Sequence, residues 1–196
     1  MHENAHGFFV LTGGPGSGKS ALIEGLEQCG YARSVEAGQG VIQDQMAIDG
    51  QALPWRNPIL FAELMLCWEM RSYHMARHQA GPVFFDRGPP GVVGYLRFLG
   101  QPALEHMQKA VDTFRYNRRV FIAPPGQDIF RPDRERHQPF DEAAGPMKPW
   151  SRPTARTATT SSRFRGCLEE RVRFVRNHVG PATPIRRTFA VTLRSI

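Results

Sequence analysis

One run near the amino end has the residue types and spacing of a phosphate-binding loop: Gly13-Gly14-Pro15-Gly16-Ser17-Gly18-Lys19-Ser20. Glycines let backbone N–H groups converge on a phosphate without a clash of Cβ atoms. A helix that starts at the loop adds the partial positive charge of its amino end. Lys19 has the reach to bind β- and γ-phosphates, and the Ser20 hydroxyl is a suitable ligand for Mg²⁺. We therefore expect these eight residues, together with Ala21, to bind a nucleoside triphosphate.

The segments on either side of this run match what a P-loop requires. Phe8–Leu11 is a short apolar run of the kind that forms a buried parallel strand. Residues 19–28 predict a helix, and Gly30 is a suitable residue to end it. The alternative is a glycine-rich turn that matches the pattern by chance, and the flanking strand and helix weigh against it.

A second candidate site follows another apolar run, Val83–Phe85. Asp86 comes directly after this run, where P-loop proteins carry the carboxylate that holds Mg²⁺, usually through water. We therefore predict Ser20 and Asp86 as the metal site, with a carboxylate that caps a turn as the simpler alternative. Arg87 is suited to a phosphate or an acceptor substrate, and equally to a salt bridge.

Glu36 follows a weak predicted strand, Tyr31–Val35, and is expected to face the same cleft. A carboxylate there could orient or deprotonate the hydroxyl of an acceptor substrate. The alternative for Glu36 is a solvated loop residue.

A basic cluster follows the last apolar run, Val120–Ala123. In a phosphoryl-transfer enzyme, arginines on a mobile lid neutralise charge on the transferring group and exclude water. The alternative is a solvated charged face, because two acidic residues are interleaved with the basic ones. The basic residues of the cluster are Arg131, Arg134, Arg136 and His137, and the interleaved acidic residues are Asp133 and Glu135.

Short apolar runs alternate with helical patterns along the chain. Asn57-Pro58 is a helix start signal, and the helix is predicted to reach about Gln79. A further helix is predicted around residues 41–48 and another from Pro102, with Pro89–Gly100 as a loop or short helix. The long helix is expected to turn one apolar face to the core, formed by Phe61, Leu64, Met65, Trp68, Ser72 and Met75. Such alternation predicts an α/β fold of three layers around a parallel sheet of about five strands.

Five motifs occur in order: F-F-V-L-T-G-G-P-G-S-G-K-S, V-E-A-G at Glu36, V-F-F-D-R-G at Asp86, R-V-F-I-A-P-P at Val120 and D-R-E-R-H-Q at Asp133. Over about residues 7–142 the chain resembles the NadR-type AAA-like ATPase and kinase family. These are small P-loop proteins related to nicotinamide riboside kinase and to nucleoside and nucleotide kinases, so the resemblance implies a kinase-like layout.

The resemblance also implies roles for individual residues. Lys19, Ser20 and Asp86 would serve ATP and Mg²⁺, Glu36 would face the acceptor, and Arg136 would lie on the lid. The chain departs from the family pattern at three positions: Gln39 stands where an arginine is usual, Gly91 where an aspartate is usual, and Gly126 where an aromatic residue is usual.

Charge is distributed unevenly along the 196 residues. The net charge is +7, but residues 1–142 carry 14 Lys and Arg against 16 Asp and Glu, whereas residues 143–196 carry 11 against 2. The basic character therefore belongs to the tail, and we do not expect residues 1–142 to bind nucleic acid. The sequence contains no run of 18 apolar residues, and its three cysteines are odd in number and far apart. We expect a protein of the reducing cytoplasm with no membrane partner.

The tail, residues 143–196, differs in character from the P-loop domain predicted for residues 1–142. Residues 145–166 are rich in Pro, Arg, Thr and Ser, which is typical of a disordered basic linker. Thr188–Leu193 alternates apolar and polar residues and could supply a last strand.

A compensated frameshift over about residues 144–166 is a second hypothesis for the tail. When residues 146–151 are back-translated and read from the third base of the Pro146 codon, the codons permit Y-E-A-M-V, in which Glu is forced. Further codons permit a helix, a Gly turn and a strand, which together would form the last βα unit of such a domain. The nucleotide sequence decides, because stops or unrelated residues in that frame would exclude the hypothesis.

These observations leave three functions open. The first is ATP- and Mg²⁺-dependent transfer of a phosphoryl group to a small nucleoside-like acceptor. The second is a nucleotide-dependent switch or regulatory ATPase without such an acceptor, which Gln39 and Gly91 favour. The third is binding of nucleic acid through the basic tail, which salt-dependent binding would reveal.

Overall fold

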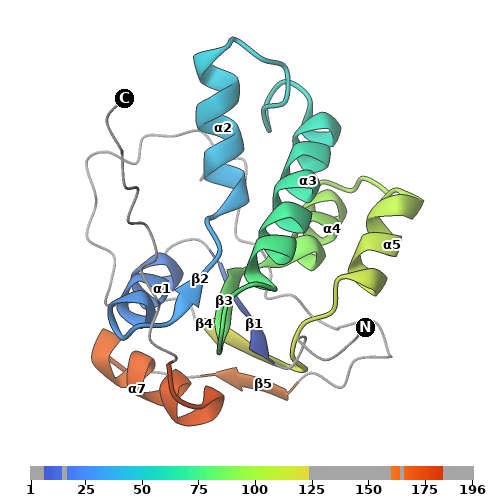
Figure 1. The fold of residues 1–196 in the computed structure, drawn as a ribbon. Helices are drawn as coiled ribbons and strands as arrows, with labels where there is room; N and C mark the ends of the chain where they lie inside the picture. Colours follow the sequence, from blue (N-terminus) through green and yellow to red (C-terminus); the bar gives the residue numbers. More distant parts are fainter. Residues whose placement is uncertain (1–6, 15–16, 124–159, 164–165, 183–196) are drawn as a thin grey trace, which may run out of the picture.

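In the computed structural model, which describes residues 7–14, 17–123, 160–163 and 166–182, five parallel strands form one sheet in the order β2-β3-β1-β4-β5. Helices cover both faces of this sheet, so the molecule has three layers (Figure 1). The prediction of an α/β fold with a parallel sheet of about five strands is confirmed. The strands are β1 Phe8–Gly13, β2 Ala32–Arg33, β3 Val83–Asp86, β4 Arg119–Ala123 and β5 Thr160–Arg163.

The register places the carboxyl ends of the central strands together. Leu11 of β1 lies opposite Asp86 of β3, and Gly13 lies opposite Ala123 of β4. Because β3 pairs directly with β1, the end of the Asp86 strand lies beside the start of the P-loop. The helices are α1 Lys19–Gln28, α2 Ala37–Ala47, α3 Pro58–Ala76, α4 Gly88–Phe98, α5 Glu105–Thr113 and α7 Leu168–Val179.

The two faces of the sheet belong to two different clusters of buried side chains, because successive residues of a strand point to opposite faces. Phe9, Phe84 and Phe121 pack with α1 and α7 on one face. Phe8 and Phe85 pack with the carboxyl end of α3 on the other face. The sheet is therefore buried on both sides, which agrees with the continuous apolar character of its central strands.

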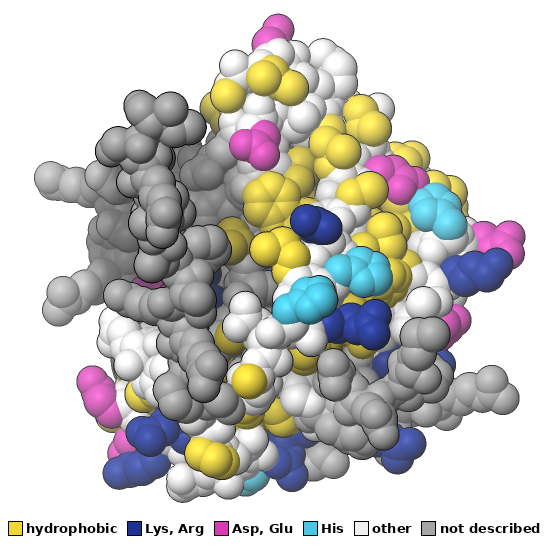
Figure 2. Space-filling view, viewed as in Figure 1, with side chains coloured by type: hydrophobic (Ala, Val, Ile, Leu, Met, Phe, Trp, Pro, Cys, Tyr) yellow, Lys and Arg dark blue, Asp and Glu magenta, His cyan; other side chains and the backbone are white. Residues whose placement is uncertain are grey.

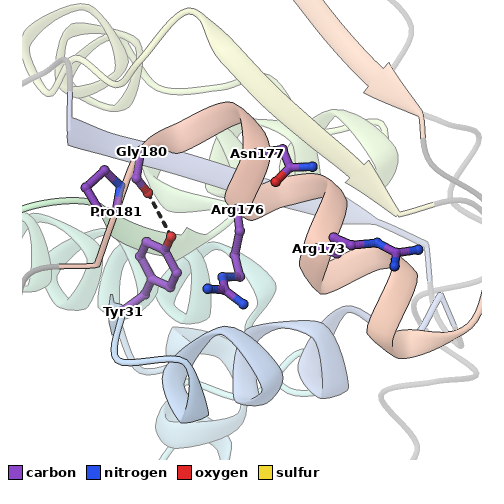
Figure 3. Close-up of a pocket in the computed structure, with 6 residues that line it drawn as sticks. All are labelled: Tyr31, Arg173, Arg176, Asn177, Gly180 and Pro181. Atoms are coloured by element: carbon purple, nitrogen blue, oxygen red, sulfur yellow. Dashed lines mark hydrogen bonds between the residues drawn. The ribbon is translucent and has the colours of Figure 1, made fainter.

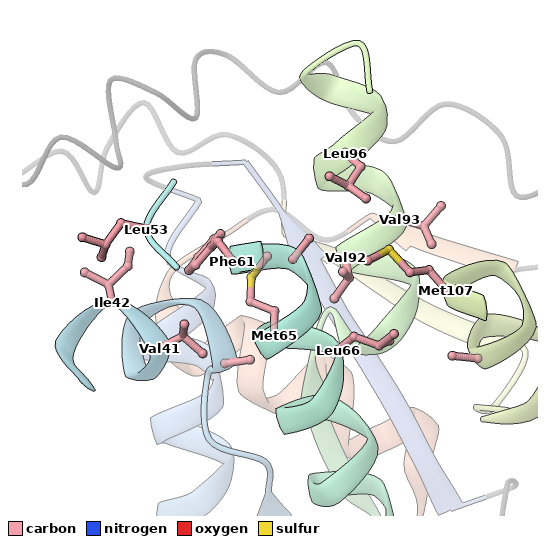
Figure 4. Close-up of a cluster of buried hydrophobic side chains, with 13 residues drawn as sticks. Val41, Ile42, Leu53, Phe61, Met65, Leu66, Val92, Val93, Leu96 and Met107 are labelled. Carbon is pink, nitrogen blue, oxygen red and sulfur yellow. The ribbon is translucent and has the colours of Figure 1, made fainter. Parts of the chain in front are cut away.

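A third cluster lies among the helices of the α3 face (Figure 4). Phe61 and Leu66 of α3 pack there with Val41 of α2, Val92 of α4 and Met107 of α5. This cluster holds α2 and α3 beside each other above the carboxyl edge of the sheet, and thereby positions any polar side chains that these helices turn toward that edge.

The helices differ from the predicted ones in several places: α5 begins at Glu105 and not at Pro102, and α3 ends at Ala76, short of Gln79. Residues 88–98 form the regular helix α4, where the sequence left a loop or short helix open. Pro89 lies in the first turn of α4, where a missing N–H costs no intrahelical bond, and Val92, Val93 and Leu96 are buried. The helix α2 begins at Ala37, earlier than its apolar pattern suggested.

The buried face of α3 is rotated by about one residue from the predicted stripe. Met75 is 57% exposed, and Leu64 and Trp68 are only partly buried. The buried residues of α3 are Phe61, Ala62, Met65, Leu66, Glu69 and Ala76. Asn57 caps the helix as predicted, because its side chain accepts a hydrogen bond from the Leu60 N–H at 3.0 Å.

The tail contributes a strand and a helix to the same sheet. The strand β5 pairs with β4, and α7 packs against α1. A strand at residues 160–163 lies within the stretch that we expected to lack order, because the edge of β4 offers unpaired backbone groups to it. The predicted boundary at residues 142 and 143, most of the frameshift region and Thr188–Leu193 lie outside the described residues.

Large exposed hydrophobic side chains gather where α2 ends and α3 begins. Figure 2 shows hydrophobic side chains on this side of the molecule over α2 and α3. The exposed residues there are Met46, Ile48, Trp55, Ile59 and Leu60. None of the helices that the structure describes has the length and apolar character that a bilayer crossing requires.

Candidate functional site

The P-loop begins where β1 ends and stops where α1 begins. Gly18 has φ 72°, a left-handed conformation that glycine adopts without strain. A Cβ added to Gly13 would lie 2.6 Å from Ser17 Oγ and 2.8 Å from the carbonyl oxygen of Ala123, so the loop has no room for a side chain there. The Ser17 N–H donates to the Gly14 carbonyl at 3.2 Å. The predicted loop residues Pro15 and Gly16 lie outside the described residues.

The amino end of α1 keeps its backbone donors free of side-chain caps. Gly18 is the N-cap and makes no side-chain hydrogen bond, so the first N–H groups of the helix have no capping oxygen. Ser17 is 1% exposed, and its hydroxyl has no hydrogen-bond partner among the described residues. Ser20 and Ala21 lie half-buried in the first turn. Uncapped donors and an unpartnered hydroxyl around a glycine turn are suited to bind an anion.

Lys19 and Asp86 form a buried ion pair between α1 and β3. The Nζ of Lys19 donates to Oδ2 of Asp86, while Oδ1 of Asp86 accepts no hydrogen bond from the part of the chain that the structure describes. The Asp86 N–H points to the Ser34 hydroxyl at 3.4 Å. The structure thus brings two of the predicted site residues together.

Arg87 lies beside this pair in a strained backbone conformation. Its φ is 68°, which is uncommon for a residue with a side chain. Its N–H donates to the Leu11 carbonyl at 3.1 Å, and its Nη2 lies 3.4 Å from the Gly13 carbonyl oxygen. The Nε of Arg87 is buried 3.9 Å from Oδ1 of Asp86 and makes no hydrogen bond within the described segments. A guanidinium held at the start of the P-loop with an unused donor is suited to bind an anionic group.

Glu69 of α3 is a buried carboxyl that sequence reasoning missed. It is 4% exposed, and none of the residues that the structure describes donates a hydrogen bond to its Oε2. Burial, followed by the charges of Asp86 and Glu36, raises the pKa of Glu69 from 4.5 to about 8, against the opposing effect of Lys19 and Arg87. The sequence did hold a signal, because Glu69 lies three, four and seven residues after the buried Leu66, Met65 and Ala62.

Glu36 is the N-cap residue of α2 and is half-buried. Its charge acts on the pKa of Glu69, which shows that the two carboxyl groups share one electrostatic environment. Glu36 makes no side-chain capping bond. The predicted lid residue Arg136 lies outside the described residues, as does the rest of the basic cluster.

A comparison with known protein families matches residues 8–148 to a family described as an AAA domain. The chain belongs to this AAA-domain family. No curated protein matches the sequence. Family membership and the loop geometry agree, so the AAA-domain protein is a nucleotide-binding P-loop NTPase.

Nucleotide in such domains is accompanied by Mg²⁺, and the residues of the AAA-domain protein fit that ion. Asp86 presents a buried oxygen with no hydrogen bond, next to the turn that carries Ser20. Among the described residues, no group of three or more His, Cys, Asp or Glu is arranged to hold a metal ion. A Mg²⁺ ion that accompanies a nucleotide commonly takes one or two protein ligands, with phosphate oxygens and water completing its coordination. Ser20 and Asp86 would hold the ion there.

One of the three departures from the NadR-type pattern, Gly91, lies in close contact with Arg87. A Cβ added to Gly91 of α4 would lie 2.5 Å from Cβ of Arg87. A side chain at position 91 therefore requires Arg87 to move. Gln39 lies exposed in the first turn of α2.

A surface pocket of about 350 Å³ lies away from these residues, between Tyr31 and the carboxyl half of α7 (Figure 3). The Tyr31 hydroxyl donates to the Gly180 carbonyl at its edge, at 2.7 Å. Arg173, Arg176 and Asn177 line it from the helix. The pocket shares no lining residue with the P-loop or with Asp86, so it is separate from the candidate site.

Proposed function

We propose that the AAA-domain protein transfers the γ-phosphoryl group of ATP, with Mg²⁺, to the hydroxyl of a small nucleoside-like acceptor. One observation carries the proposal. Glu69 places a buried carboxyl with an unpartnered oxygen near Asp86, Lys19 and Arg87, on the α3 side of the P-loop. A polar group buried without a partner costs stability, and natural proteins keep such groups mainly at functional sites.

The proposed roles follow from the environment of each group. Lys19 and the loop amides bind the phosphates, and Ser20 and Asp86 hold Mg²⁺. Glu36 accepts the proton of the acceptor hydroxyl. The hydroxyl oxygen bonds to the γ-phosphorus, and the bond from that phosphorus to the ADP oxygen breaks. Glu69, which carries a proton at neutral pH, donates a hydrogen bond that orients the acceptor. Arg136 neutralises charge on the transferring group.

The test incubates the protein with labelled ATP, Mg²⁺ and a panel of nucleosides and seeks a labelled acceptor. Lys19→Ala should abolish the product, whereas Lys109→Ala, on the exposed face of α5, should not. Glu36→Gln, which removes the base, and Glu69→Leu, which removes the donor, should each lower acceptor phosphorylation at least tenfold and leave nucleotide affinity within about twofold. Tight nucleotide binding with no labelled product from any nucleoside would overturn the proposal.

The second candidate is a nucleotide-dependent switch that has no small-molecule acceptor. Gly91 favours it, because position 91 carries no carboxylate that could contact an acceptor. A Cβ at this position would lie 2.5 Å from Cβ of Arg87. In this case the same assay gives ADP or bound nucleotide alone, and the acceptor panel has no effect on the rate of ADP formation.

A further inference from the structure

A buried arginine of the carboxyl-terminal helix contacts the backbone of the P-loop. Arg171 lies in the first turn of α7 and is 5% exposed. Its Nη1 donates to the carbonyl oxygen of Ser17 at 2.9 Å, across 154 positions of the sequence. Its Nε donates to the carbonyl oxygen of Gly166 at 2.9 Å. The guanidinium therefore links the start of α7 to the P-loop.

The bond to Ser17 bears on the direction of a phosphate-binding amide. The Ser17 carbonyl and the Gly18 N–H belong to one planar peptide unit, in which the two groups point in opposite directions. A guanidinium that holds the carbonyl oxygen on the outside of the turn thus directs the Gly18 N–H to its inside. A charged donor also makes this bond stronger than one between neutral groups.

Packing ties the position of Arg171 to α1, the helix that starts at the loop. Val172 and Val175 of α7 share a buried cluster with Leu22 and Leu26 of α1. A Cβ added to Gly25 of α1 would lie 2.8 Å from Cγ2 of Val172, so the two helices touch closely there. Arg171 can hold the loop only while α7 stays docked on α1.

We propose that Arg171 is a positioning residue for the P-loop, and that it couples the docking of α7 to the binding of nucleotide. Coupling between two equilibria is reciprocal. A docked α7 therefore increases the affinity of the loop for nucleotide, and bound nucleotide stabilises docked α7 by the same factor. The inference requires nucleotide binding but no phosphoryl transfer, so it stands or falls separately from the proposed kinase activity.

The first experiment measures the affinity of the full chain for ADP with Mg²⁺ by calorimetry. Arg171→Ala should weaken binding about tenfold, within the usual range of coupling between sites. Arg173→Ala is the matched control, because Arg173 lies two residues along the same helix and is exposed. It should change affinity less than twofold. Equal affinities for the two variants would overturn the proposal.

The second experiment reads the reciprocal effect, which a purely structural arginine would not show. Amide hydrogen exchange is followed over residues 168–179 with and without ADP, at least 10 °C below the melting temperature of each variant. In the native chain ADP should slow exchange in α7 about tenfold, and in Arg171→Ala it should slow exchange only in α1 and the loop. Exchange in native α7 that ignores ADP would overturn the coupling.

A third series applies if Arg171→Ala does not melt cooperatively. Gly25→Ala presses a methyl group on Val172 and should weaken ADP binding several-fold, because α7 is displaced. Adding Val172→Ala makes room for that methyl group and should restore most of the affinity. If Gly25→Ala leaves affinity unchanged, or if the double variant is no better than Gly25→Ala, the docking of α7 has no part in nucleotide binding.

Discussion

Two helices on opposite faces of the sheet each bring a buried ionisable side chain to the surroundings of the P-loop. Arg171 of α7 is 5% exposed, and two carbonyl oxygens accept its hydrogen bonds. Glu69 of α3 is 4% exposed, and its Oε2 accepts none. Burying a charge is costly unless partners compensate it. Arg171 meets that cost through the backbone and Glu69 through a raised pKa, so the first belongs to the scaffold and the second is left available to a ligand.

The largest expected effect tests whether a buried charge near the loop depends on its partner. Lys19→Ala leaves the buried Asp86 without its hydrogen-bonded ion-pair partner and with only Arg87 nearby, which should lower the free energy of unfolding by about 3–5 kcal/mol. The double variant Lys19→Ala/Asp86→Asn should recover most of that loss, because it also removes the buried carboxylate. Urea denaturation of both variants provides the measurement. A double variant as unstable as Lys19→Ala alone would show that the ion pair is not the cause.

Glu69→Gln should act in the opposite direction and raise stability at neutral pH. The pKa of Glu69 is about 8 in the folded protein, against an ordinary value of 4.5. The stability that the protonated carboxyl provides is therefore complete below pH 4.5 and is lost as the pH rises toward 8. The free energy of unfolding should therefore fall by about 1.4 kcal/mol per pH unit in this window, and Gln should abolish that slope.

The expected gain for Glu69→Gln at pH 7 is on the order of 3 kcal/mol. Glu24→Gln is the control, because Glu24 is exposed on α1. Denaturation curves between pH 5 and 8 should separate the two variants, and parallel curves for native protein and Glu69→Gln would contradict the assignment.

Arg171→Ala tests the other buried ionisable side chain of the comparison. Removing the guanidinium leaves the carbonyl oxygens of Ser17 and Gly166 without that donor, which should cost about 2 kcal/mol at any pH between 5 and 8. The loss is independent of pH because no group with a shifted pKa is removed. A pH-dependent loss in the same denaturation series would mean that Arg171 acts through an ionisable neighbour.

The smallest expected effects lie at the amino ends of the two helices. Asn57→Ala removes the cap of α3, and Glu170→Ala removes the carboxylate that accepts from the Cys167 N–H at the start of α7. Each should cost about 1 kcal/mol. Only Glu170→Ala should also weaken ADP binding, because it loosens the turn that holds Arg171, whereas Asn57 lies three turns from Glu69. Melting curves and ADP titrations on the same samples test both statements.

The difference between these regions also explains what sequence reasoning could reach. The loop and Asp86 were predictable because their residue types are tied to the ends of short apolar strands, a local pattern. The helix α4 was left open because Pro89 and Pro90 resemble a turn, although prolines fit the first turn of a helix. The short strand β2, Ala32–Arg33, spans only part of the predicted 31–35 segment, and Glu36 became a helix cap.

Glu69 and Arg171 were beyond reach for different reasons. Glu69 was missed because apolar residues occur around most of α3, so two different apolar faces fit its sequence. The face that we predicted to be buried does not include position 69. Arg171 depends on a contact with Ser17 that no local pattern encodes, because the fold alone brings the two residues together. Local periodicity thus predicts where a helix forms more reliably than which of its side chains is buried.

The distance along the chain between Ser17 and Arg171 has a consequence for biosynthesis. A ribosome that adds about 5–20 residues per second reaches Arg171 about 8–30 s after Ser17. During that interval the nascent chain carries its glycine turn without the guanidinium that orients the Gly18 amide. Nascent chains that end before residue 171 should therefore retain ATP poorly, and cellular ATP would assist folding only late in translation.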